Sequence, residues 1–187
     1  MSDTDFVSNY LSNLGTLLPK LDQEKIAQAI SWMRETRDIG NTIYICGNGG
    51  SASIASQMVV DIVKGASFKK KARFKMLGLT DSIATITAYA NDEGYETVFV
   101  EQLKNYAQPG DILMAISGSG NSANVLNAVE YANSVGCKTI GYTTGEGGKL
   151  KDLVELPLLV PSNHMGRLED CFFILTHILC YAFMEAD

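Results

Sequence analysis

Five short apolar runs constrain the fold of this chain more than any other feature of its sequence. They alternate with longer segments of helical periodicity, and they are TIYIC (42–46), FKMLGL (74–79), DILMAIS (111–117), KTIGYT (138–143) and LPLLV (156–160). Strands that alternate with helices are typical of βαβ units, in which helices cover both faces of a parallel sheet. The pattern predicts an α/β fold with a five-stranded parallel sheet flanked by helices.

Helices are expected between these runs and ahead of the first one. The intervening segments predict helices near residues 51–64, 82–90, 96–106, 123–135 and 167–185. Two more are expected before residue 41, separated by Pro19, and Asp22 is a suitable N-cap for the second. No repeat or linker divides the chain. We therefore expect one domain over residues 1–187, with an N-terminal helical hairpin (1–40) and an α/β sandwich (41–187).

The charge balance and the cysteines limit the partners of the protein. It carries 21 acidic and 15 basic residues, a formal net charge of −6, which disfavours a nucleic-acid-binding face. No apolar stretch reaches the length of a membrane span, and no secretory signal is visible. The four cysteines lack the CxxC spacing of a metal knuckle, which favours free thiols in a reducing compartment. We expect a cytoplasmic protein without nucleic-acid or membrane partners.

Two glycine- and serine-rich loops follow predicted strands. They are CGNGGSA (46–52) and AISGSGNSANV (115–125), and in parallel sheets ligands bind beyond the carboxyl ends of the strands. Hydroxyls and bare backbone N–H groups at a helix N-terminus suit an anion. The lysine of the nucleotide-binding loop and the glycine spacing of the dinucleotide fingerprint are both missing. The loops predict a compact phosphomonoester and no nucleotide cofactor, although tight turns without a ligand would also explain them.

The two loops together resemble the SIS (sugar isomerase) domain. The motifs AND (90–92) and GRLED (166–170), followed by His177, resemble the phosphoheptose isomerase branch of that family. The resemblance implies a single SIS domain and a homotetramer that uses the two N-terminal helices. It also implies an aldose–ketose isomerase of heptose biosynthesis, which converts sedoheptulose 7-phosphate to D-glycero-D-manno-heptose 7-phosphate.

The resemblance assigns the substrate-binding residues of this chain. Gly118 stands where the family often has threonine, so one phosphate-binding hydroxyl is missing, at a cost of about 1 kcal/mol. The implied substrate-binding residues are Asn48, Gly49, Gly50, Ser51, Asn91, Asp92, Ser117, Gly118, Ser119, Ser122 and Glu169.

The positions of the catalytic and metal-binding residues depart from the family pattern. The family typically has histidine at Gln57, glutamate at Asp61 and glutamine at Glu169, and only His177 is retained. In members that bind zinc, these four side chains are the ligands. The resemblance therefore implies a possible divalent metal, zinc or manganese, held by Gln57, Asp61, Glu169 and His177.

An aldose–ketose isomerase needs a base and an acid around an enediol. We expect Asp61, Glu169 and His177 to be catalytic, with Asp61 or Glu169 as the base and His177 as the acid or a metal ligand. Residues eight apart on a helix differ by about 80° in direction, so Glu169 and His177 are expected to face the same neighbour. Simpler alternatives are a core histidine at 177 and a helix-capping acid at 169.

A second function from another class is also compatible with the altered site. Some SIS proteins of this branch are non-catalytic, keep the phosphate loop and bind a replication-initiator protein. The replacements at positions 57, 61 and 169 remain ionisable or able to bind metal, and position 61 stays acidic. These features favour the enzyme over the binding protein.

Overall fold

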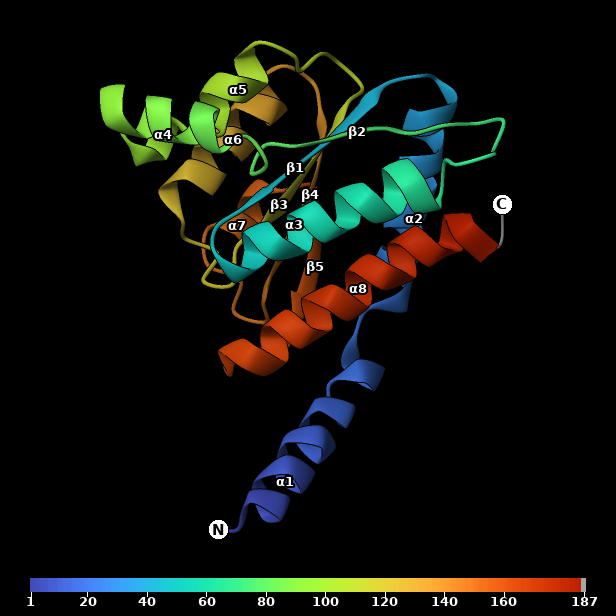
Figure 1. Ribbon diagram of the computed structural model, residues 1–187, viewed down its shortest axis with the longest axis vertical. Helices are drawn as coiled ribbons and strands as arrows, with labels where there is room; N and C mark the ends of the chain where they lie inside the picture. The colour runs from blue at the N-terminus through green and yellow to red at the C-terminus, as the bar shows by residue number, and fades with distance from the viewer. Residues whose placement is uncertain (186–187) are drawn as a thin grey trace.

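A computed structural model describes residues 1–185, and its centre is one parallel sheet (Figure 1). All five predicted strands form: β1 (Thr42–Gly47), β2 (Lys75–Gly78), β3 (Ile112–Ile116), β4 (Lys138–Thr144) and β5 (Leu156–Val160). Every neighbouring pair is parallel, in the order β2-β1-β3-β4-β5. The predicted α/β fold with a five-stranded parallel sheet is confirmed.

The strand order creates one switch point in the sheet. The chain runs from β1 outward to β2 and then returns to place β3 on the other side of β1. Connections on the two sides of such a point diverge, which leaves a crevice at the carboxyl ends of the two strands. The two glycine- and serine-rich loops follow β1 and β3, so both open at this crevice.

Helices cover the sheet on both faces because its strands bury both sets of side chains. Along β1, Ile43 and Ile45 belong to one apolar core, and Tyr44 and Cys46 belong to the other. The first core lies under α2 (Gln23–Asp38), α3 (Gly50–Val60) and α8 (Met165–Glu185). The second lies under α5 (Val100–Lys104), α6 (Ala123–Ser134) and α7 (Leu150–Leu153).

The helices differ from expectation at four places. The helix that begins at Gly50 ends in a π-helical turn, η2 (Asp61–Gly65), and α4 (Ile83–Asp92) ends two residues later than predicted. The helix expected over 96–106 is instead a 3₁₀ turn, η3 (Tyr95–Thr97), followed by α5. The four-residue α7 is too short to show periodicity in the sequence.

The two N-terminal helices occupy different parts of the structure. After α1 (Asp3–Gly15), the 3₁₀ turn η1 (Leu18–Lys20) leads into α2, which packs on α8 and β5. In Figure 1, α1 extends beyond the body of the protein, and it has no buried residue. Its Tyr10 hydroxyl donates to Asp170 Oδ2 on α8 at 2.6 Å. Both helices form, but α1 does not lie along α2 as the expected hairpin requires.

Two further features concern the membrane and the thiols. Within residues 1–185, no helix is both long and apolar enough to cross a membrane. All four cysteines are free and buried. Burial raises the pKa of the Cys46 thiol to about 12, so the group stays protonated at neutral pH.

Candidate functional site

A cavity of about 270 Å³ lies at the carboxyl ends of β1 and β3. Its lining side chains come from the two loops and from the start of α8, which are far apart in the sequence. Its lining residues are Asn48, Ser51, Ile116, Ser117, Gly118, Ser119, Ser122, Met165 and Glu169. Seven of these nine are residues that the sequence predicted for substrate binding, so the structure brings most of that set together.

The turn after β1 depends on two glycines that do not line the cavity themselves. Gly49 adopts a φ of +54°, a left-handed conformation that side chains disfavour, and α3 begins at the next residue. A Cβ on Gly50 would press against Glu169 Oε1 and lie 2.8 Å from Glu169 Cδ. The missing side chain at Gly50 therefore provides the space in which the Glu169 carboxylate sits.

The loop after β3 presents a cluster of hydroxyls at the start of α6. Ser117 Oγ lies 3.1 Å from Ser122 Oγ and 3.5 Å from Ser119 Oγ. Ser122 is the N-cap residue of α6, yet its side chain makes no capping hydrogen bond. Its hydroxyl is directed to the serine cluster instead of the helix backbone. Hydroxyls and unpaired N–H groups at a helix N-terminus bind anions such as phosphate.

Met165 explains how the loop accommodates a glycine at position 118. A Cβ on Gly118 would lie 3.1 Å from Met165 Sδ and 3.3 Å from the buried Leu168. The space that a larger residue would use is thus filled from α8. Met165 also lines the cavity, and no signal in the sequence marked it.

Asn48 is held by two residues that the sequence analysis missed. Its side-chain amide forms a reciprocal pair with Asn124 on α6, with both hydrogen bonds at 2.9 Å. The Tyr95 hydroxyl of η3 donates to Asn48 Oδ1, also at 2.9 Å. Asn124 is buried, and buried amides are normally hydrogen-bonded. Burial is visible only in the folded chain, so the sequence carried no signal for either Asn124 or Tyr95.

A second polar group lies between α3 and α8, which run side by side (Figure 1). Gln57 Nε2 donates to Asp61 Oδ1 at 3.1 Å, and His177 Nε2 lies 3.8 Å from Asp61 Oδ2. Asp61 Oδ2 is buried and has no hydrogen-bond partner among residues 1–185. Buried carboxylate oxygens are normally paired, so this atom is an unsatisfied hydrogen-bond acceptor next to His177.

Glu169 and His177 both face α3, as their spacing predicted. Glu169 lies against Gly50 at the start of that helix, and His177 lies against Asp61 at its end. Along α8, eight residues correspond to a rise of about 12 Å. The side chain of His177 is half exposed, so it is not the buried core histidine that was the simpler alternative.

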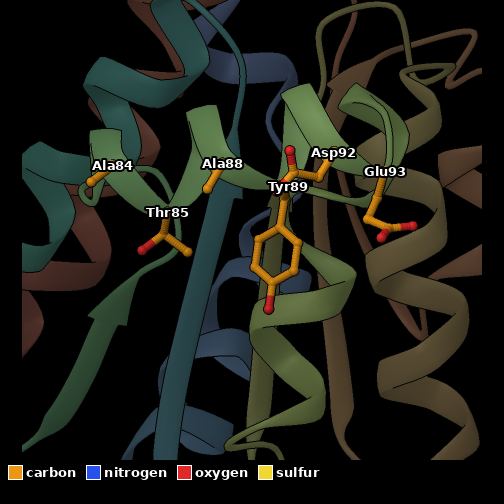
Figure 2. Close-up of a pocket in the computed structure, with 6 residues that line it drawn as sticks. All are labelled: Ala84, Thr85, Ala88, Tyr89, Asp92 and Glu93. Carbon is orange, nitrogen blue, oxygen red and sulfur yellow. The ribbon is translucent and has the colours of Figure 1, made fainter.

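Asn91 and Asp92 lie away from the serine cavity. Both are on α4, where Asn91 Nδ2 donates to Asp92 Oδ1 at 2.8 Å. Asp92 contributes to a different cavity, of about 430 Å³, which Figure 2 shows along one face of α4. Tyr89 and Glu93 line the same cavity. Substrate binding by Asn91 and Asp92 stays a prediction, because the described chain does not bring them to the other predicted residues.

Comparison with known proteins identifies the family. The SIS domain matches residues 8–144. The phosphoheptose isomerase of Aliarcobacter butzleri is 36% identical over 176 residues, which cover 93% of each chain. The chain belongs to the phosphoheptose isomerase family of SIS domain proteins.

Solved structures of phosphoheptose isomerases share the whole fold. GmhA from Neisseria gonorrhoeae has a TM-score of 0.90 at 28% identity, covering 97% of this chain and 98% of that one. The enzyme from Francisella tularensis has a TM-score of 0.92 at 29% identity, and each chain is covered completely. The family resemblance drawn from the two loops is confirmed.

The four metal ligands expected in this chain, at positions 57, 61, 169 and 177, do not form one complete site. Within residues 1–185, no three His, Cys, Asp or Glu side chains are grouped so that they could hold a metal ion. Asp61 and His177 approach each other, but the amide N–H₂ of Gln57 faces Asp61, and Glu169 lies against Gly50. Zinc in proteins needs three or four N, S or O ligands. The described arrangement offers two and does not fit zinc.

Proposed function

We propose that the protein interconverts sedoheptulose 7-phosphate and D-glycero-D-manno-heptose 7-phosphate in heptose biosynthesis. Its relatives across almost the whole chain are named phosphoheptose isomerases. The observation that carries the proposal is the cavity in which the serine cluster at the N-terminus of α6 and the Glu169 carboxylate occur together. An anion site next to hydroxyl-binding groups suits a phosphorylated sugar.

The phosphate binds to Ser117, Ser119 and Ser122. Their hydroxyls and the N-terminal N–H groups of α6 supply donors, and the helix dipole adds favourable potential for a dianion. Asn48 and Glu169 line the same cavity, where they bind hydroxyls of the sugar. An amide and a carboxylate can together donate to and accept from hydroxyls.

Proton transfer takes place at the Asp61–His177 pair. The reacting C1 and C2 lie at the opposite end of the seven-carbon chain from the phosphate, and His177 lies two turns beyond Glu169 on α8. Asp61 takes a proton from C1 while His177 protonates the carbonyl oxygen on C2, which gives the enediol. Return of the proton to C2, with loss of the O1 proton, gives the aldose. Gln57 holds Asp61 through Oδ1 and leaves Oδ2 unpaired.

This mechanism contains no step that uses a metal, because the described donor set does not fit zinc. Whether zinc or manganese changes the rate is answered by assays with a chelator and with each added ion.

The proposal further includes a homotetramer in the cytoplasm. Phe6, Val7 and Leu11 support the assembly, since they expose apolar surface on α1, and sedimentation velocity measures it.

The test is proton exchange at C1 and C2 of sedoheptulose 7-phosphate in D₂O, followed by NMR. Wild-type protein is expected to exchange these protons and to form the heptose phosphate. Asp61→Asn and His177→Ala are each expected to lower kcat by about 10²–10⁴-fold, the usual contribution of a general base or acid. Glu169→Gln is expected to raise KM while exchange continues.

Other outcomes have distinct meanings. Exchange that survives in Asp61→Asn and disappears in Glu169→Gln would make Glu169 the base. Binding of the sugar without exchange by wild-type protein would refute isomerisation of this substrate. It would favour the non-catalytic sugar-phosphate-binding protein, whose partner would then be a replication initiator.

A further inference from the structure

The side chain of Asn48 is held by three hydrogen bonds from two other elements. Asn48 follows β1 and lines the cavity. Its Oδ1 accepts from Tyr95 Oη and from Asn124 Nδ2, and its Nδ2 donates to Asn124 Oδ1, each at 2.9 Å. One loop, one helix and one 3₁₀ turn therefore meet at a single amide.

The hydrogen-bonding capacity of the Asn48 amide shows which of its groups remains free to bind a ligand. An asparagine amide has two N–H donors and one oxygen with two lone pairs. Tyr95 and Asn124 occupy both lone pairs of Asn48 Oδ1, and Asn124 takes one of its N–H donors. The second N–H of Asn48 is the remaining group, and it belongs to a residue that lines the cavity.

We infer that Tyr95 is a positioning residue for sugar-phosphate binding, and that it acts by orienting the Asn48 amide as a hydrogen-bond donor into the cavity. This inference rests on the proposed function, because it concerns the same site. The Tyr95 hydroxyl donates to Asn48 Oδ1 and thereby stabilises the orientation in which the Asn48 N–H₂ group remains free to donate. Without it, Asn48 keeps its pair with Asn124 but loses one of the two donors that hold the oxygen in place.

The position of Tyr95 in the chain links the cavity to α4. The residue follows Gly94, whose φ of +109° is disfavoured for residues with side chains, and it begins η3, which Glu93 and Gly94 separate from the end of α4. Its side chain remains 53% exposed. Because Tyr95 is exposed and belongs to neither apolar core, removal of its hydroxyl is expected to change the orientation of Asn48 with little effect on the core.

A double-mutant cycle tests the inference. Tyr95→Phe, Asn48→Ala and the double variant are compared with wild type by isothermal titration of sedoheptulose 7-phosphate and by steady-state kinetics. Tyr95→Phe is expected to raise Kd and KM about fivefold, the value of one neutral hydrogen bond, with kcat unchanged. In the Asn48→Ala background the same change is expected to have no further effect. Tyr106→Phe, at a tyrosine that is 59% exposed, is the matched control.

The results separate a positioning role from a general structural one. Equal effects of Tyr95→Phe in both backgrounds, or no effect in either, would overturn the inference. The titration needs no turnover, so an inactive protein that binds the sugar refutes isomerisation and still tests Tyr95.

NMR of the Asn48 side-chain amide provides a readout without any ligand. The two N–H signals are assigned by their loss in Asn48→Ala. Tyr95→Phe is expected to shift them and to speed their exchange with water, whereas Tyr106→Phe leaves them unchanged. Unchanged Asn48 signals in Tyr95→Phe would overturn the inference even for a protein that binds no sugar phosphate.

Discussion

Replacement of Gly50 by alanine tests the proposed binding role of Glu169 separately from the stability of the fold. The new Cβ would press on Glu169 Oε1 and lie 2.8 Å from Cδ, both at the flexible end of a side chain. The carboxylate therefore moves, and the backbone does not. Gly50 is the first residue of α3 and lacks a positive φ, so alanine is tolerated there. Because alanine is the better helix former, the free energy of unfolding is expected to stay within about 1 kcal/mol of wild type or to rise.

The effect on binding is expected to be larger. A hydrogen bond to a charged group contributes about 1.5–3 kcal/mol, which corresponds to about a 10- to 100-fold change in KM when the carboxylate leaves the cavity. Urea unfolding gives the stability, and initial rates with sedoheptulose 7-phosphate give KM. Gly15→Ala is the matched control, since its Cβ would meet no atom within 4 Å.

Two results would refute this reasoning. An unchanged KM in Gly50→Ala would show that the position of Glu169 has no part in substrate binding. An equal rise of KM when Gly50→Ala is added to Glu169→Ala would show that the substitution acts through another group.

Three other substitutions or treatments have defined outcomes. Gly118→Thr together with Met165→Ala is expected to lower the Kd for the sugar phosphate about fivefold, because it adds one hydroxyl. In Gly118→Thr alone the new side chain meets Met165 Sδ, so the Kd is expected to fall less. Calorimetry measures both Kd values, and equal values would contradict the role of Met165. Phe172→Ala, at a fully buried residue whose ring lies 5.7 Å from that of Tyr142, is expected to destabilise the protein by about 3–5 kcal/mol in urea, and a loss below about 1 kcal/mol would be inconsistent with this packing. Burial raises the pKa of the Cys46 thiol to about 12, so native protein is expected to react with a disulfide reagent at pH 8 only after unfolding; rapid reaction of Cys46 in the folded protein would contradict this.

The sheet could be predicted because its signal is local. Each strand is a short apolar run between polar turns, and β1 to β5 all form where the sequence indicated them. The helices were predicted less well at their ends. The segment expected as one helix over 96–106 breaks at Val98 and Phe99, both of which are buried in the second core. Burial of these side chains outweighs the helical propensity of the segment.

The serine-rich loop after β3 was also predictable, since every part of it is contiguous. Ser117, Ser119 and Ser122 lie in one loop, and the following helix supplies the N-terminus. The contacts of Asn48 with Asn124 and Tyr95 were not predictable, because they join residues 76 and 47 positions apart. Such pairs depend on how α6 and η3 pack against the loop after β1, and the spacing of residues in the sequence does not reveal that packing.

The sequence by itself determined the parallel sheet, the serine-rich loop at the start of α6 and the family, because each is encoded in contiguous residues or in a fixed spacing. Tertiary structure decided which predicted residues act together. It placed Glu169 in the space left by Gly50, set Asp61 next to His177, and left Asp92 on the separate cavity of α4. The physical reason is that a binding site joins the ends of elements whose relative positions are set by packing against the sheet, and only the folded chain fixes those positions.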